Sequence, residues 1–299
     1  EENIEQMANA LLELADSQLT EYACDIVFID NNSVDATRDK LASLCQQDKR
    51  VKAIFNARNF GAVSSYYGIM QMETDCVITI PCDFQIPLSM IPQALRKWEA
   101  GSKIVAFVKG GTEEHGIKRM CRKLYYALLI KFSPIPQIPH FTGAGLYDQE
   151  FITVCRKLND PIPSMRGNVA EFGYKVEFMP YQEVLRKRGK SKNNFFALFD
   201  LAMRNFIAYT NLVPRMSTML GVALSALSFA VGLYYLVQKL LHWNTFVAGM
   251  TPVLIGMFFL GGIELLFLGL IGEYLMQINA RIKNHPLVIE EKRINFTEH

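Results

Sequence analysis

The sequence predicts an α/β domain with a mostly parallel sheet, followed by an interfacial helix and two membrane-spanning helices. The first observation behind this prediction is a repeated succession of apolar strand, polar turn and helix in roughly the first 100 residues. The second is a pair of long apolar stretches, 217–237 and 252–276. Together they predict a domain of catalytic size that is attached to a membrane.

The strand, turn and helix succession occurs three times. Strand 25–29 leads to the turn 30–37 and a helix with Ser33 and Asp35 as N-cap candidates, strand 51–55 to the turn 56–61 and helix 62–71, and strand 76–80 to the turn 81–87 and helix 90–100. Such alternation favours a parallel sheet with helices on both faces, in which ligands bind at the carboxyl ends of the strands. The three polar turns therefore mark the predicted binding site.

The second part of the domain has weaker signals. We expect a strand at 103–109, a helix at 117–132, a glycine-punctuated turn at 141–147 leading into a helix at 148–156, and a late strand at 176–180. The stretch 194–211 is amphipathic and precedes an apolar segment, which fits a helix lying in the membrane interface. A buried helix of a bundle is the alternative for this stretch.

The two apolar stretches predict a membrane anchor. The first has no charged side chain and is long enough to cross a hydrocarbon core of ~30 Å, although a buried core helix is the alternative. Arg204 and Arg215 precede the first stretch, and Arg281 and Lys283 follow the second. By the positive-inside rule both flanks lie in the cytoplasm. The sequence thus predicts a multi-pass protein of the cytoplasmic membrane with its catalytic domain in the cytoplasm.

Composition excludes several other classes of protein. The formal net charge of +2 gives no reason to expect nucleic acid as a partner. The six cysteines are irregularly spaced and include no CxxC pair, so neither a zinc site nor a disulfide scaffold is indicated. We expect free thiols in a reducing compartment.

Carboxylates and amides in the polar turns are the candidate binding groups. Asp30 ends the first strand and could accept hydrogen bonds from a base or ribose, although Asp at a strand end is usually a turn or cap former. Asp83 follows an apolar strand and precedes Gln85, and such hard oxygens are those that Mg²⁺ prefers when it bridges a diphosphate.

A basic run at 186–192 is the remaining candidate. It is not a Walker motif, because Val184 stands where the first glycine would be needed. It is either a solvated charge run or a phosphate clamp made by Arg186, Lys190 and Lys192.

Taken in order, the segments 30–37, 58–61, 83–87, 141–148, 186–192 and 271–274 resemble the bacterial polyprenyl-phosphate glycosyltransferases. These are family 2 enzymes with a GT-A fold, similar to dolichol-phosphate mannose synthase. The match runs over nearly the whole chain, and relatives of this kind form homotetramers. The resemblance implies a GT-A domain over 1–193, a juxtamembrane amphipathic helix over 194–214, a transmembrane hairpin over 215–278 and a cytoplasmic tail over 279–299.

The resemblance also implies a reaction, the inverting transfer of a sugar from a nucleotide sugar, by family analogy a UDP-sugar, to a polyprenyl phosphate such as undecaprenyl phosphate. By motif match, the nucleotide would be bound by Asp30, Asn32, Asp35, Arg58 and Asn59, and Mg²⁺ or Mn²⁺ by Asp83 and Gln85. The phosphates would be bound by Arg186, Lys190, Ser191 and Lys192, with Asp83, Asp148 and Arg186 as the catalytic group.

The sequence departs from the family pattern at three places. Where the family often has Asp-x-Asp, this chain has Pro81-Cys82-Asp83, which leaves one carboxylate for the metal. The acceptor loop has no acid, and Asp148 is its nearest carboxylate; a phosphate monoester is already an anion and needs no general base. The first strand is missing from the pattern before residue 4.

These departures leave an alternative open, in which the protein is an inactive or truncated homologue that acts as a membrane scaffold. A processive polysaccharide synthase is less favoured, because the Gln-x-x-Arg-Trp motif is absent and a two-span anchor offers no channel.

Overall fold

The computed structural model describes residues 2–110, 138–158, 160, 163–182, 250–282 and 285–296, together with single residues and short runs between 219 and 241. The chain divides into two compact units. One consists of Glu1–Ala127, Ile135–Asn194 and Asn284–His299, and the other of Leu128–Pro134 and Phe195–Lys283.

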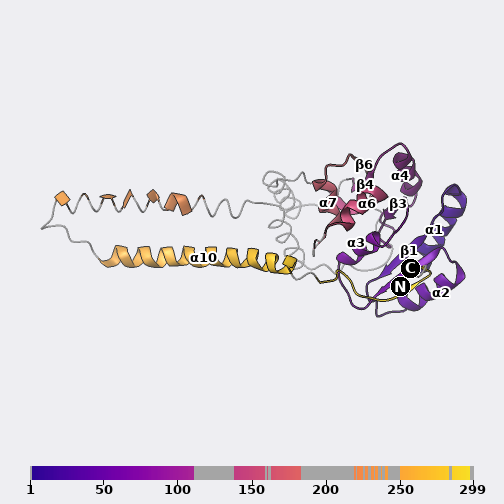
Figure 1. Ribbon diagram of the computed structural model, residues 1–299, viewed down its shortest axis with the longest axis horizontal. Coiled ribbons are helices and arrows are strands. Elements are labelled where there is room, and N and C mark those ends of the chain that lie inside the picture. Colours follow the sequence, from indigo (N-terminus) through magenta and orange to yellow (C-terminus); the bar gives the residue numbers. More distant parts are fainter. Residues whose placement is uncertain are drawn as a thin grey trace. The chain divides into compact units, whose positions relative to one another are not determined.

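The first unit alternates helices and strands (Figure 1). Its helices are α1 (Ile4–Gln18), α2 (Thr37–Gln47), α3 (Val63–Met70), α4 (Met90–Glu99), α6 (Gln149–Arg156) and α7 (Met165–Glu171). Its strands are β1 (Ile26–Asp30), β2 (Val51–Asn56), β3 (Cys76–Thr79), β4 (Ile104–Lys109), β5 (Phe141–Asp148), β6 (Val176–Tyr181) and β7 (Glu290–Ile294). The mixed α/β class predicted from the sequence is confirmed.

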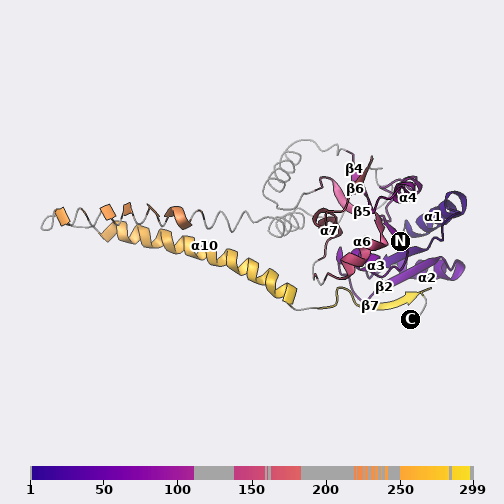
Figure 2. The same ribbon diagram turned by 45° about the horizontal axis from the view of Figure 1, so that its top comes forward.

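The first sheet has the strand order β1-β2-β7. β1 and β2 are parallel, with Ile26 opposite Val51 and Asp30 opposite Phe55. β7 pairs with β2 in the antiparallel sense, and Figure 2 shows it beside β2 near the C-terminus. Part of the segment predicted to be a tail is therefore a strand of the sheet.

The second sheet has the order β3-β5-β4-β6. β5 runs antiparallel to both of its neighbours, β3 and β4, whereas β4 and β6 are parallel. The prediction of a mostly parallel sheet holds only in part for the described strands: β1 and β2, and β4 and β6, are parallel pairs, whereas β5 and β7 run against the strands beside them. The direction in which a strand enters a sheet depends on its partners and not on its own residues.

The segment 141–147 is also different from its prediction. It is part of β5 and not a turn, and its glycines explain the error. A Cβ atom on Gly145 would lie 2.3 Å from the carbonyl oxygen of Val105 on β4. Glycine is needed there because two backbones approach closely inside the sheet.

The second sheet is buried on both faces. Along β4, Val105 and Phe107 point into a cluster that includes residues of α4. Ile104 and Ala106 point to the other face, into a cluster with residues of α3, α6 and α7. This alternation follows from the two-residue period of a strand, and burying each large apolar side chain contributes about 1.5–3 kcal/mol.

A third cluster lies between the first sheet and helices α1 and α2. It contains Met7 of α1, Leu41 of α2, Phe28 of β1 and Phe55 of β2. This packing fixes the ends of β1 and β2, from which the polar turns begin.

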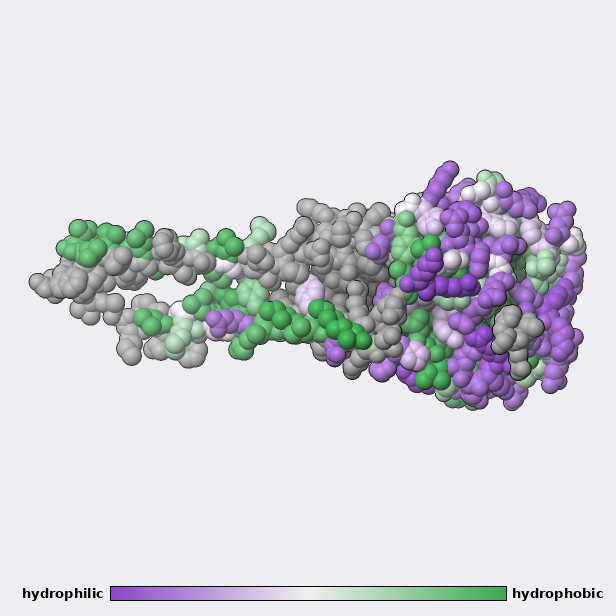
Figure 3. Space-filling view, in the orientation of Figure 1, coloured by the Kyte–Doolittle hydropathy of each residue, from purple (hydrophilic) through white to green (hydrophobic). Residues whose placement is uncertain are grey.

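The second unit contains α10 (Met250–Ile282), a helix of 33 residues. The described side chains of α10 in Figure 3 are mostly hydrophobic. Among the residues that the structure describes, no helix combines the length and apolar character needed to cross a bilayer. The two predicted spanning helices are therefore not confirmed. The segment 194–214, and much of 217–237, lie outside the described residues.

Candidate active site

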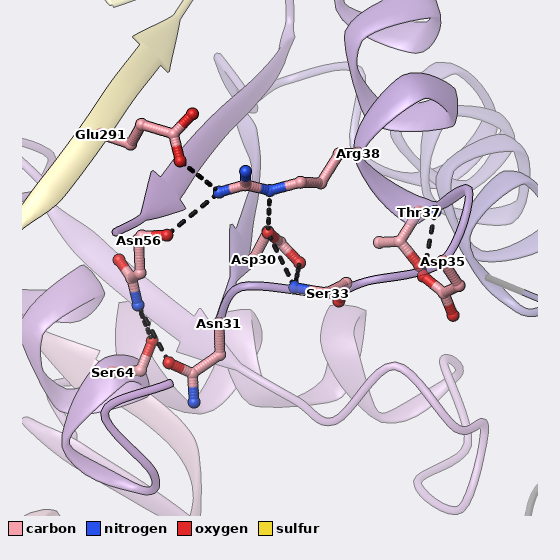
Figure 4. A network of polar contacts seen from close by, with 9 residues as sticks. All are labelled: Asp30, Asn31, Ser33, Asp35, Thr37, Arg38, Asn56, Ser64 and Glu291. Atoms are coloured by element: carbon pink, nitrogen blue, oxygen red, sulfur yellow. Dashed lines mark hydrogen bonds and ion pairs between the residues drawn. The ribbon is translucent and has the colours of Figure 1, made fainter. Parts of the chain in front are cut away.

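Asp30 ends β1, and its carboxylate lies inside a hydrogen-bonded turn (Figure 4). The residue is only 3% exposed. Arg38 Nε donates to Oδ2 at 2.8 Å, and the backbone N–H of Ser33 donates to Oδ1 at 3.1 Å and to Oδ2 at 3.2 Å. Because both oxygens are engaged, Asp30 shapes the turn from within.

Asn31, which the sequence analysis did not select, joins the first polar turn to the second. Its Oδ1 accepts hydrogen bonds from the backbone N–H of Phe60 at 2.8 Å and from Asn56 Nδ2 at 3.2 Å. Its Nδ2 donates to Asn59 Oδ1 at 2.9 Å and to the carbonyl oxygen of Gly61 at 3.1 Å. One side chain thus holds the ends of β1 and β2 in register with each other.

Asn32 and Asp35 occupy the outer part of the first turn. Asn32 has φ of 63°, in the left-handed region that Asn tolerates better than most residues. Asp35 is exposed, and hydrogen bonds from the side chain and backbone of Thr37 lower the pKa of its carboxyl group. The helix itself begins at Thr37 with Ala36 at the N-cap position, so neither Ser33 nor Asp35 is its N-cap.

The second turn presents a cation and an amide. The guanidinium of Arg58 lies 4.3 Å from the centre of the Phe60 ring, within the range of a cation–π interaction. Asn59 Oδ1 accepts from the backbone N–H of Gly61 at 2.8 Å as well as from Asn31. Both residues are exposed, and their placement beside the first turn agrees with a shared binding surface.

Asn56 lies beneath these two turns and is fully buried. Its Nδ2 donates to Ser64 Oγ at 2.6 Å and to Asn31 Oδ1. Its Oδ1 has no hydrogen-bond partner among the described residues. A buried acceptor without a partner is uncommon and costs free energy.

Asp83 lies in the turn that follows β3, and it is half-buried. Its Oδ1 accepts a hydrogen bond from the backbone N–H of Gln85 at 3.2 Å. Between them Phe84 has φ of 58°, a conformation that costs a non-glycine residue about 1–3 kcal/mol and is found most often at functional sites. Cys82 and Phe84 pack against the cluster that contains Phe28 and Phe55. The Asp83 turn therefore adjoins the same core as the ends of β1 and β2.

The oxygen atoms of Asp83 and Gln85 suit a metal ion only when the substrate supplies further ligands to that ion. Among the described residues, no group of three or more His, Cys, Asp or Glu could hold a metal. Burial raises the pKa of Cys82 to about 11, which keeps its thiol protonated at neutral pH. One carboxylate and one amide oxygen fit Mg²⁺ that is also bound by diphosphate oxygens and water.

Asp148 belongs to the other end of the second sheet. It lies opposite Cys76 at the start of β3, whereas Gly145 lies opposite Thr79 at the end that leads to Asp83. Its carboxylate accepts from Trp98 Nε1 at 2.7 Å, Lys103 Nζ at 3.1 Å and the backbone N–H of Glu150 at 2.9 Å, which caps α6.

Burial alone would raise the pKa of Asp148, but these hydrogen bonds outweigh it and lower the pKa. A capped, ion-paired carboxylate at the far end of the sheet argues against the predicted catalytic role.

The remaining predicted residues, Arg186, Lys190, Ser191 and Lys192, lie outside the described residues. The sequence analysis did not select Arg38 or Glu291, which contact this site in the structure. Arg38 Nη2 donates to the carbonyl oxygen of Asn56 at 3.0 Å and to Glu291 Oε2 at 2.9 Å. The only sequence signal for them is the presence of opposite charges on segments that the fold brings together.

In α/β folds, ligands bind at the carboxyl ends of the strands, which is where the polar turns after β1, β2 and β3 lie. The family model of glycosyl transferase family 2 matches residues 1–151. The chain belongs to this family of glycosyltransferases.

The relatives extend the match beyond that domain. The SfII prophage-derived bactoprenol glucosyl transferase of Shigella flexneri is 30% identical over 278 residues, covering 92% of this chain and 89% of its own length. The bactoprenol glucosyl transferase of Shigella phage SfX is 29% identical over 279 residues, with 92% and 91% covered. An uncharacterized glycosyltransferase of Synechocystis, sll0501, is 28% identical over 291 residues, with 97% and 91% covered.

Proposed function

We propose that this glycosyltransferase transfers a sugar, with inversion, from a nucleotide sugar to a polyprenyl phosphate at the cytoplasmic face of the membrane. The observation that carries the proposal is the similarity to relatives named bactoprenol glucosyl transferases along most of the chain. UDP-glucose is the first donor to test, because those relatives are named for glucose and the family resemblance points to uridine.

The nucleotide would bind over the first two polar turns. Asn31 and buried Asp30 hold these turns in shape, and Asn32, Asp35, Arg58 and Asn59 are at their outer surface. Arg58 supplies positive charge for a phosphate oxygen, and the amides supply hydrogen bonds to the ribose or base.

Asp83 and Gln85 would hold Mg²⁺ or Mn²⁺ together with the diphosphate. The metal, when bound, neutralises the charge that develops on the departing nucleoside diphosphate. The Asp83 turn contributes rigidity, because its strained Phe84 is fixed by packing against the core. A carboxylate that is already held in place stabilises the transition state more than one that must first reorient.

The acceptor phosphate needs positioning more than it needs a base. Its second pKa is about 6, so at neutral pH it is already a nucleophilic anion. We assign the phosphate clamp to Arg186, Lys190, Ser191 and Lys192. The lipid acceptor and the apolar stretches 217–237 and 252–276 favour a location in the cytoplasmic membrane, and the family resemblance favours a homotetramer.

The test uses membranes that contain the full chain, radiolabelled UDP-glucose and undecaprenyl phosphate, with and without EDTA. We expect a lipid-linked sugar whose formation EDTA abolishes. Asp83→Ala should reduce the rate by about 100-fold or more, as loss of a group that stabilises transition-state charge does. Asp75→Ala is the matched control, since Asp75 is exposed at the other end of β3 and should leave the rate unchanged.

Each alternative outcome has a distinct meaning. Absence of glycolipid with every nucleotide sugar would favour the membrane scaffold. Turnover at the wild-type rate by Asp83→Ala would refute the metal assignment, and long polymer as the product would favour a polysaccharide synthase. Lys192→Ala should raise the KM for the lipid more than the KM for the donor, and the reverse would refute the phosphate clamp.

A further inference from the structure

Glu291 of β7 contacts a residue that holds the first polar turn. β7 follows α10 along the chain and pairs with β2, whose last residue is Asn56. Lys292 lies opposite Phe55 and Glu290 lies opposite Asn56, so the pairing skips Glu291. Such a bulge inserts one extra residue into a strand, and next to a site it redirects a side chain.

The redirected side chain meets Arg38. Glu291 Oε2 accepts from Arg38 Nη2 at 2.9 Å, the same nitrogen donates to the carbonyl oxygen of Asn56, and Nε donates to Asp30 (Figure 4). One guanidinium on α2 therefore ties together the ends of β1 and β2 and the bulge of β7. A guanidinium group that is bound by carboxylates on two sides keeps its orientation better than one that is bound on a single side.

The burial of the three charges decides what each one can do. The side chain of Asp30 is 1% exposed, that of Arg38 24% and that of Glu291 49%. Removal of Arg38 would leave a buried carboxylate unpaired, which strongly destabilises a fold. Removal of the half-exposed Glu291 leaves Asp30 paired and takes away only the outer restraint on Arg38.

We propose that Glu291 is a positioning residue for the donor site: through Arg38 it holds Asp30, and with it the turn from Asn31 to Ser33, in the conformation that binds the nucleotide. This inference rests on the proposed function, since it takes the first turn to be the nucleotide end of the site. Glu291 lies after α10 and outside residues 1–151, which the family 2 model matches. The inference therefore gives a segment beyond that match a role in donor binding.

The experiment compares Glu291→Gln with Glu290→Gln in the full chain purified in detergent. Glu290 lies next to Glu291 on β7 but pairs with Arg293, so it is a matched control that leaves Arg38 untouched. We measure the Kd for UDP by calorimetry, the KM for UDP-glucose and for undecaprenyl phosphate, kcat, and the melting temperature.

For Glu291→Gln we expect a Kd for UDP and a donor KM that are about two- to fivefold higher, the size expected for one half-exposed ion pair. The acceptor KM and kcat should not change, and the melting temperature should fall by no more than about 4 °C, as expected for one half-exposed ion pair. The difference from wild type should shrink at 1 M salt, where such a pair is screened, and Glu291→Asp should recover part of the affinity. A purely structural role would move the melting temperature instead.

Three results would overturn the inference: wild-type affinity for UDP in Glu291→Gln, equal weakening in both variants, or a fall in melting temperature with unchanged donor KM. A wild-type chain that binds none of UDP, GDP, CDP and dTDP would refute the proposed function and this inference with it. Normal binding by the wild type combined with an unaffected Glu291→Gln refutes the inference alone.

Discussion

Replacing Gly145 by alanine tests whether β5 is a strand in contact with β4. The added Cβ would lie 2.3 Å from the carbonyl oxygen of Val105, 3.2 Å from Cα of Ala106 and 3.3 Å from the carbonyl carbon of Val105. All three atoms belong to backbone inside the sheet, so no side chain can move aside. The closest contact is roughly 1 Å too short, and the two strands must separate.

We expect Gly145→Ala to lower the free energy of unfolding by about 3 kcal/mol, the upper part of the range for overpacked cores. For a domain of this size the melting temperature should fall by roughly 6–12 °C. Thermal unfolding of the full chain in detergent, followed by circular dichroism, measures both quantities.

Gly173→Ala is the control for this substitution. Apart from Gly173 and its two chain neighbours, no heavy atom of the described residues lies within 4 Å of its Cβ position, whereas its φ of 71° opposes alanine. The backbone strain should cost about 1 kcal/mol. If Gly145→Ala unfolds at the same temperature as Gly173→Ala, the close approach of β4 and β5 is wrong.

Two further predictions concern polar side chains. Asn31→Ala removes four hydrogen bonds, two of which are exposed to water. It should lower the free energy of unfolding by about 2 kcal/mol and raise the donor KM. An unchanged donor KM would contradict the role of Asn31 in joining the two turns. Asp148→Asn should keep the wild-type kcat where it is folded, whereas loss of turnover in a folded variant would restore the catalytic role of Asp148. Because the pKa of Asp148 is lower in the folded state, its carboxylate stabilises the fold above about pH 4, and this contribution to the free energy of unfolding is lost as pH falls through the folded-state pKa. Acid unfolding should therefore show a shallower decline for Asp148→Asn than for the wild type in this window.

Local sequence patterns predicted most elements of the first unit. The strands expected at 51–55 and 76–80 are β2 and β3, and the helix expected at 90–100 is α4. These elements have short apolar runs or an amphipathic period that their own residues determine. Strand pairing was not predictable in the same way, because it joins residues far apart in the chain.

The two missed strands show why. In β5, Gly145 has the residue type of a turn but is selected by a neighbouring backbone that only the folded sheet supplies. In β7, the sequence Glu-Glu-Lys-Arg-Ile has no apolar alternation, because the strand lies at the edge of its sheet. Charged residues are common on such edges.

The candidate site was predicted in part. The turns that carry Asp30, Asn59 and Asp83 were found from their places after apolar strands. The roles of Asn31 and Arg38 were not, since their partners come from other turns and from β7. Asp148 was selected for its place in the sequence beside the glycines, whereas the antiparallel direction of β5 carries it to the opposite end.

The late position of β7 in the chain has a consequence for biosynthesis. While the ribosome makes everything between Asn56 and Glu290, the outer edge of β2 has no partner and exposes its peptide groups to other chains. Nascent protein in this period is open to intermolecular strand addition, and its protection depends on chaperones or on rapid completion. Once translated, the charged strand closes that edge and presents a surface on which further strands do not readily assemble.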